Sequence, residues 1–118
     1  MKRFLILLSF LFCVIGIFAQ NDYYMKQAQS YQREAEYYTK QALGYEREVV
    51  YYNRQVRDYL REAEYYSKRQ NYDRVESYQR RARNATEKAE SYARKAKYAR
   101  KRAQSYLRKA INALERSE

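Results

Sequence analysis

The main pattern along the chain is a fourteen-residue repeat of tyrosines set among alanines and polar residues. Tyrosine pairs begin fourteen residues apart, at Tyr23, Tyr37, Tyr51 and Tyr65. Single tyrosines fall midway, at Tyr31, Tyr45 and Tyr59, and the period resumes later at Tyr78, Tyr92 and Tyr106. Fourteen residues are two heptads, and a seven-residue period is typical of helices that pack in coiled coils.

One heptad phase places small or aromatic residues at both core positions. Position a is occupied by Ala28, Ala35, Ala42, Val49, Val56 and Ala63, and later by Val75, Ala82, Ala89, Ala96, Ala103 and Ala110. Position d is occupied by Tyr24, Tyr31, Tyr38, Tyr45, Tyr52, Tyr59 and Tyr66, and later by Tyr78, Ala85, Tyr92, Ala99, Tyr106 and Ala113. The pattern predicts two long helices whose core is built from alanine and tyrosine.

The spacing breaks between Tyr66 and Val75, which predicts a turn there. Either Asn71 or Asp73 can cap a new helix, and Asp73 with Glu76 has the spacing of a capping box. The stretch YYSKRQNYDRVESYQRRA, residues 65–82, resembles the inter-helix turn of a tetratricopeptide-type helical hairpin, with Gln70 where that family favours glycine. The resemblance implies a hairpin and no particular partner. The alternative is one continuous helix with a shift of phase.

A register in which paired residue numbers sum to 141 favours the hairpin. It sets large residues against small ones, for example Tyr52 against Ala89, which fills a core without voids. The layer of Ala42 and Ala99 is small on both sides, with Gly44 beside it, so the helices are expected to approach closely or bend there. The g positions then pair opposite charges: Glu62 with Arg81, Glu48 with Lys95, and Glu34 with Lys109. We predict an all-α fold of two long antiparallel helices forming a coiled-coil hairpin (helix 22–69, turn 70–72, helix 73–116).

The first nineteen residues have the order of a secretory signal peptide. Basic Lys2 and Arg3 precede an apolar run from Phe4 to Phe18, and Ala19 precedes the polar residues that follow. The interpretation is a signal peptide at 1–19 and a helical domain at 20–118, secreted to the extracellular space or, in a bacterium, to the periplasm. An uncleaved membrane anchor is the alternative.

The composition argues against catalysis. The chain has no His, Pro or Trp and one Cys, and that Cys lies in the predicted signal peptide. The commonest general base and metal ligand is therefore absent, and no nucleophile–base pair or phosphate-binding glycine loop is present. We expect no enzyme activity, no cofactor and no metal site.

Positive charge is concentrated in the second half. Residues 20–118 hold 23 Lys and Arg against 14 Asp and Glu, a net charge of +9, and Tyr72–Glu118 alone carry +8. The basic cluster, which contains no acidic residue, comprises Arg94, Lys95, Lys97, Arg100, Lys101, Arg102, Arg108 and Lys109. It is either a solvated face or a surface for a polyanion. After export, the expected partners are an anionic glycan, an anionic membrane surface or mineral, and no nucleic acid is expected.

Five tyrosines fall outside the a and d positions of both helices. These outer tyrosines, all at position c, are Tyr23, Tyr37, Tyr51, Tyr65 and Tyr98. They suggest self-association, stacking on sugars or oxidative cross-linking. The first functional hypothesis is a secreted structural or interaction protein, a tyrosine-rich homo-oligomer of an extracellular matrix or adhesive layer. The second is a cationic helical binding module for anionic membranes, acidic glycans or unfolded exported proteins.

Overall fold

The computed structural model describes the backbone of residues 2–118 and the side chains of residues 22–118. Helix α1 spans Lys2–Lys68 and helix α2 spans Tyr72–Ser117, and no strand occurs in residues 2–118. The predicted signal peptide, residues 1–19, lies outside the residues whose side chains are described. α1 begins before the predicted boundary at residue 22, and no proline occurs that would force a break between the two segments.

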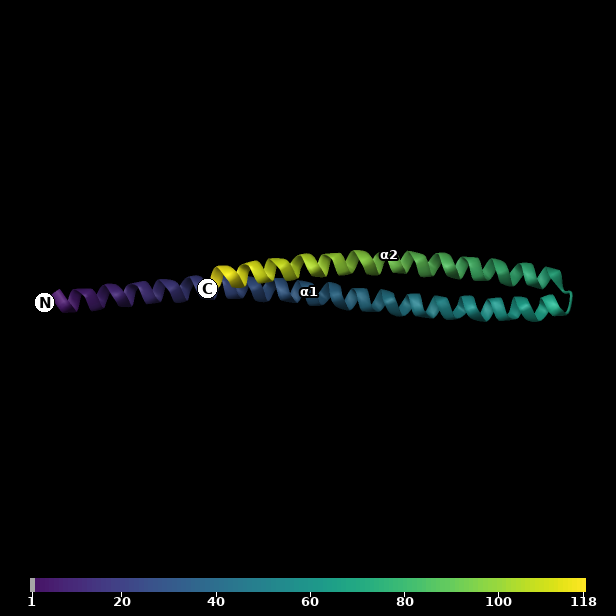
Figure 1. Ribbon diagram of the computed structural model, residues 1–118, viewed down its shortest axis with the longest axis horizontal. Coiled ribbons are helices and arrows are strands. Elements are labelled where there is room, and N and C mark those ends of the chain that lie inside the picture. Colours follow the sequence, from purple (N-terminus) through teal and green to yellow (C-terminus); the bar gives the residue numbers. More distant parts are fainter. Residues whose placement is uncertain (1) are drawn as a thin grey trace. The chain divides into compact units, whose positions relative to one another are not determined.

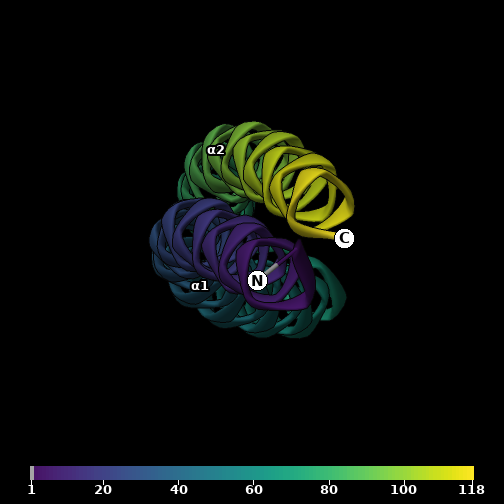
Figure 2. The ribbon, with the colours of Figure 1, turned by 90° about the vertical axis from the view of Figure 1, so that its left-hand side faces the viewer.

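The two helices pair in two units. The turn unit is Tyr38–Lys101, and the end unit joins the residues up to Tyr37 with Arg102–Glu118. Within each unit, a stretch of α2 runs alongside a stretch of α1 in the opposite direction (Figure 1), and the view along the helices again shows the two side by side (Figure 2). The predicted all-α hairpin is therefore confirmed, and the alternative of one continuous helix is wrong.

The turn is closed by backbone hydrogen bonds that end α1. The Asn71 N–H donates to the Tyr66 carbonyl at 3.0 Å, and the Gln70 N–H donates to the Ser67 carbonyl at 3.1 Å. These two bonds define a Schellman motif, which needs a left-handed residue just after the helix. Gln70 fills that position with a φ of 57°. Gln70 thus adopts a left-handed conformation at the position where tetratricopeptide-type hairpins favour glycine.

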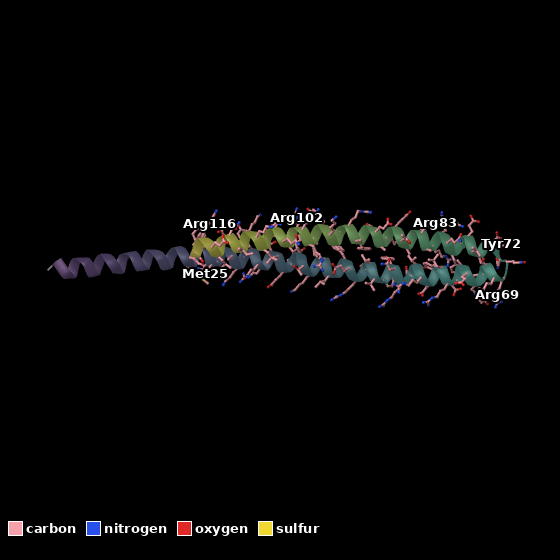
Figure 3. All side chains as sticks on the ribbon, viewed as in Figure 1. Met25, Arg69, Tyr72, Arg83, Arg102 and Arg116 are labelled. Carbon is pink, nitrogen blue, oxygen red and sulfur yellow. The ribbon has the colours of Figure 1, made fainter. Side chains whose placement is uncertain are left out.

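Asn71 begins α2. Its side-chain oxygen accepts a hydrogen bond from the Arg74 N–H at 3.4 Å, and its carbonyl accepts the first helical bond, from Val75, at 3.2 Å. Of the two capping residues left open by the sequence, Asn71 is the N-cap, and Asp73 lies in the first turn of the helix. The linker is therefore residues 69–71, one residue earlier than predicted. Figure 3 labels its first residue, Arg69, and the first residue of α2, Tyr72.

The core of the described residues consists of alanine. Twelve alanines are at most 5% exposed, and all occupy positions a or d: Ala28, Ala35, Ala42, Ala63, Ala82, Ala85, Ala89, Ala96, Ala99, Ala103, Ala110 and Ala113. No large side chain of residues 22–118 is fully buried. The tyrosines at d are all partly buried, which leaves room for their hydroxyl groups to reach water.

Ring contacts across the helices agree with the register of 141. Tyr92, predicted to face Val49, lies between Tyr45 and Tyr52, with ring centroids 6.0 and 5.8 Å away. Tyr78, predicted to face Ala63, lies between Tyr59 and Tyr66, at 6.2 and 5.6 Å. In the end unit, Tyr31 and Tyr106 are 6.2 Å apart. Tyr78 and Tyr92 therefore each pack between two α1 rings that flank the predicted partner residue.

Gly44 has a different role from the one expected. A Cβ atom added to Gly44 would meet nothing within 4 Å, so the close packing of Ala42, which is fully buried, does not depend on the missing side chain of Gly44. Position c points away from the partner helix, and this is why a glycine there leaves open space rather than a close helix contact.

Candidate functional site

Four basic residues at position g of α2 lie over tyrosine rings. The charged groups of Arg81, Lys95 and Lys109 are 5.1, 5.0 and 4.9 Å from the ring centroids of the tyrosines three residues before them. Lys88 lies 5.5 Å from the ring centroid of Tyr52, across the hairpin. The tyrosine ring carries a negative face, which attracts a cation at such distances.

This arrangement differs from the predicted g-to-g ion pairs. The ion pairs recorded in residues 22–118 do not include Glu62 with Arg81, Glu48 with Lys95 or Glu34 with Lys109. A long, exposed ion pair costs side-chain entropy at both ends and contributes little. A tyrosine one turn earlier on the same helix is already held by packing. Contact with it therefore costs the side-chain entropy of the cation alone.

The cation–tyrosine contacts belong to a repeated local structure. The segments SYQRR, SYARK and SYLRK recur at residues 77–81, 91–95 and 105–109. In each, the α2 tyrosine contacts an α1 tyrosine in nearly the same geometry: Tyr59 with Tyr78 at 6.2 Å and 36°, Tyr45 with Tyr92 at 6.0 Å and 34°, and Tyr31 with Tyr106 at 6.2 Å and 34°. We call these three structures the cation–tyrosine repeats, and each lies within one unit.

A groove accompanies the repeat at residues 91–95. It has a volume of about 390 Å³, and its lining residues are Gln41, Tyr45, Ser91, Arg94, Lys95, Tyr98 and Ala99. Two members of the predicted basic cluster and one outer tyrosine thus meet in this groove. No carboxylate is among its lining residues, so the positive charge of the groove is not offset at its walls.

Arg100 is set apart from the rest of the basic cluster. Its guanidinium donates to both carboxylate oxygens of Glu46, from Nε at 2.6 Å and from the terminal nitrogen at 2.8 Å. The hydrogen bonds hold the pKa of Glu46 below its usual value, with a smaller charge attraction in the same direction, and raise the pKa of Arg100. Because its charge is matched, Arg100 is the weakest member of the predicted polyanion surface.

The remaining members of the basic cluster are exposed on α2. Arg108 and Lys109 belong to the end unit, where Lys109 also lies 5.9 Å from the Tyr31 ring centroid. Lys97, Lys101 and Arg102 are exposed as well, and none of the three lines the groove at residues 91–95. The members of the basic cluster therefore have different neighbours and do not form one uniform patch.

The outer tyrosines lie on the surface, where the heptad phase predicts them. Their exposed fractions range from 46% to 63%. Tyr23, Tyr51 and Tyr65 each meet the following tyrosine edge-on, with ring centroids 5.1 to 5.2 Å apart. Contacts with polar neighbours add to this, since Gln55 donates to the Tyr51 hydroxyl at 2.8 Å and Arg69 lies 4.2 Å from the Tyr65 ring centroid. The rings of Tyr23, Tyr51 and Tyr65 thus contact neighbouring side chains while staying 46% to 63% exposed.

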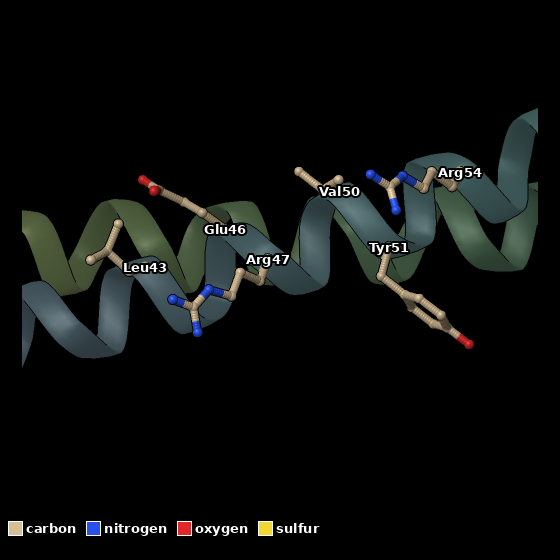
Figure 4. A pocket seen from close by; sticks show the side chains of 6 residues that line it. All are labelled: Leu43, Glu46, Arg47, Val50, Tyr51 and Arg54. Atoms are coloured by element: carbon tan, nitrogen blue, oxygen red, sulfur yellow. The ribbon is translucent and has the colours of Figure 1, made fainter.

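Sequence reasoning missed a second set of exposed apolar residues. This aliphatic set comprises Met25, Leu43, Val50, Leu60, Leu107, Ile111 and Leu114. All seven occupy positions b or e, which lie on the opposite side of each helix from positions c and g. Figure 4 shows Leu43 and Val50 projecting to one side of α1 and Tyr51 to another. The same heptad phase that located the outer tyrosines contained this signal.

Neither a membrane span nor a metal cluster is found in the part of the chain with described side chains. Between residues 22 and 118, no helix is both long and apolar enough to cross a bilayer. The same residues hold no group of three or more acidic, histidine or cysteine side chains placed to bind a metal ion. Comparison with protein families, curated proteins and solved structures found no match to this chain.

Proposed function

We propose that this protein is a secreted, non-enzymatic structural protein whose helical hairpins associate with one another in an extracellular matrix or adhesive layer. The observation that carries the proposal is that the large apolar and aromatic side chains lie on the surface and not in the core. Among residues 22–118, the buried residues are all alanine, whereas thirteen large apolar or aromatic side chains are 39% to 67% exposed. Contiguous exposed apolar surface usually marks a contact.

The charge on the surface favours a second copy of this chain as the partner. Over residues 22–117, positions b and e carry six acidic residues against four basic ones, a net charge of −2: Asp22, Glu36, Glu46, Glu64, Glu76 and Glu90, and Arg57, Arg83, Lys97 and Arg100. Positions c and g carry an excess of cations. The side with the aliphatic set is therefore opposite in sign to the side with the outer tyrosines, so the two different sides of two copies attract each other.

Sedimentation velocity on the purified protein, at low and at high salt, tests the proposal. Association through apolar side chains persists at high salt, because salt screens charges and leaves apolar burial intact. A monomer under both conditions, across the concentration range, would contradict the structural function.

A second candidate function is supported by a different observation. The cations of the cation–tyrosine repeats are held on rings rather than neutralised by carboxylates, and this favours a binding module for polyanions. Retention on an anionic resin that falls as salt rises, by a protein that remains monomeric, would favour this second function over the first.

A further inference from the structure

The groove at residues 91–95 combines the types of side chain that recognise an acidic sugar. The rings of Tyr45 and Tyr98 offer apolar faces with polar edges, on which a sugar ring can stack. Arg94 and Lys95 supply positive charge beside those rings, and an anion there gains charge-assisted hydrogen bonds. No other groove described on the turn unit combines two rings, two cations and uncharged donors without a carboxylate.

The uncharged members of the groove complete the match. Gln41 offers an amide that both donates and accepts hydrogen bonds, and Ser91 offers a hydroxyl. Sugar hydroxyls need such partners, whereas a simple inorganic anion does not. The groove is therefore equipped to bind the ring of an acidic sugar as well as its charge.

We propose that the two cation–tyrosine repeats of the turn unit, at residues 77–81 and 91–95, bind the carboxylate or sulfate groups of one extended acidic polysaccharide. The repeat at residues 91–95 is the most complete, because Tyr98 adds a second ring where the equivalent positions of the other repeats hold Asn84 and Asn112. This inference rests on the second candidate function and does not depend on self-association.

The spacing of the repeats suits a chain-like ligand. Arg81 and Lys95 lie in the same unit and are fourteen residues apart along α2, which is about 21 Å at about 1.5 Å per residue. A ligand long enough to reach both repeats gains avidity over one that fills a single repeat. Affinity is therefore expected to rise steeply once the oligosaccharide spans this distance.

The same features disfavour a membrane surface as the partner. A helix that lies on a bilayer inserts apolar side chains beside its cations. Here the aliphatic set occupies positions b and e, whereas the contacting tyrosine and cation of each cation–tyrosine repeat lie at positions d and g. The tyrosines at d are also partly buried between the helices, so a single extended chain reaches them more easily than a flat surface does.

Isothermal titration of the purified protein tests this proposal, at a concentration where sedimentation shows a single species. The probes are a sulfated oligosaccharide (heparin fragments of increasing length), a carboxylated one (oligogalacturonate), neutral dextran, vesicles with anionic lipid, and oligothymidylate. We expect both acidic oligosaccharides to bind, longer fragments to bind more tightly, and dextran not to bind. Equal or tighter binding to vesicles or to oligothymidylate would overturn the assignment to a polysaccharide.

Two variants with the same change of charge locate the site. Arg94→Gln with Lys95→Gln removes two cations from the groove, and Arg57→Gln with Arg83→Gln removes two cations from position b of the same unit. We expect the first variant to weaken oligosaccharide binding about tenfold or more, since charge-assisted hydrogen bonds are lost, and the second to change it far less. Equal losses in the two variants would mean diffuse charge attraction and would overturn the site.

Tyr98→Asn separates stacking from charge. The change gives the repeat at residues 91–95 the asparagine that the other two repeats hold at the equivalent position. Because Tyr98 is exposed, circular dichroism is expected to show an unchanged helix content. We expect weaker binding of the oligosaccharides with the same dependence on salt, because the number of cations is unchanged. Unaltered affinity in this variant would contradict the role assigned to the ring.

Discussion

At the scale of single residues, Gln70 carries the backbone strain of the turn. Its φ of 57° lies in the left-handed region, which costs an ordinary residue about 1 kcal/mol and costs glycine little. Gln70→Gly is therefore expected to raise the free energy of unfolding by somewhat less than about 1 kcal/mol, because glycine also gains entropy in the unfolded chain.

Thermal unfolding followed by circular dichroism measures the effect of Gln70→Gly. Gln70→Ala is the control, since it shortens the side chain and keeps the Cβ that causes the strain. A glycine variant less stable than both the parent and the alanine variant would show that the Schellman geometry is not limiting at this turn.

The ion pair of Glu46 and Arg100 makes a pH-dependent contribution. Hydrogen bonds from Arg100 lower the pKa of Glu46 in the folded protein. A lowered carboxyl pKa stabilises the fold above the ordinary glutamate value of about 4.3, and the contribution is lost as the pH falls through the folded pKa. The effect is expected to be small, because both groups are exposed to solvent and screened.

Urea unfolding of the parent protein and of Glu46→Gln checks this contribution at two pH values. We expect the parent to be the more stable at pH 7, and the difference to disappear in acid well below the ordinary pKa of glutamate. A difference that persists unchanged in acid would mean that Glu46 acts through packing rather than through its charge.

At the scale of helices, the alanine layers limit how the pair can be altered. Ala42 is fully buried and Ala99 is 2% exposed, so a larger side chain at either has no space. Ala42→Leu is expected to destabilise the fold by about 1–3 kcal/mol through overpacking. Gly44→Ala, two residues away and facing open space, is expected to stabilise it by about 1 kcal/mol through helix propensity.

Denaturant unfolding of these two variants provides the comparison, with Ala93→Leu as the control for leucine itself. Ala93 is the exposed alanine among residues 22–118, so leucine there adds no core volume. If Ala42→Leu were as stable as Ala93→Leu, the layer of Ala42 and Ala99 would not be tightly packed.

The helices and their core were predictable because both follow from the period of the sequence. Positions a and d identify every buried alanine, and the break after Tyr66 locates the turn to within one residue. The capping choice between Asn71 and Asp73 was not predictable, since both residues satisfy the same local rule. The start of α1 at Lys2 was not predicted. A composition typical of a signal peptide indicates a cleavage site and does not indicate whether the backbone before that site is helical.

The candidate site was predicted less completely, for a physical reason. Heptad positions say which side chains are neighbours, but a long lysine at g can reach either a carboxylate across the hairpin or a ring on its own helix. Lys95 lies over Tyr92 rather than pairing with Glu48, and a heptad diagram does not separate these two outcomes. The pair of Glu46 and Arg100 was not predicted, because both residues lie at position e and the predicted charge pairs all lie at position g.

At the scale of the whole molecule, the exposed side chains fall into two chemically different groups. The outer tyrosines share positions c and g with an excess of cations, whereas the aliphatic set shares positions b and e with an excess of carboxylates. The proposed polyanion site uses no residue of the aliphatic set. Variants of the aliphatic set therefore test self-association while leaving that site intact.

The last prediction compares these two groups in self-association. Replacing Tyr23, Tyr37, Tyr51 and Tyr65 together by glutamine is expected to leave helicity nearly unchanged and to weaken association, because exposed aromatic surface is lost and no core layer changes. Replacing Leu43, Val50 and Leu60 by glutamine is expected to weaken association as well, because these residues supply the apolar surface of the net negative side, which attracts the net positive side of another copy.

Circular dichroism and sedimentation velocity on both variants distinguish the outcomes, with Tyr45→Gln and Tyr52→Gln as the folding control. These two tyrosines pack on Tyr92 between the helices, so their loss is expected to melt the turn unit. If the outer-tyrosine variant melts as readily as this control, the heptad phase is wrong. If neither surface variant changes the mass of the assembly, the exposed side chains do not hold copies together, and binding to a polyanion becomes the function that the surface supports.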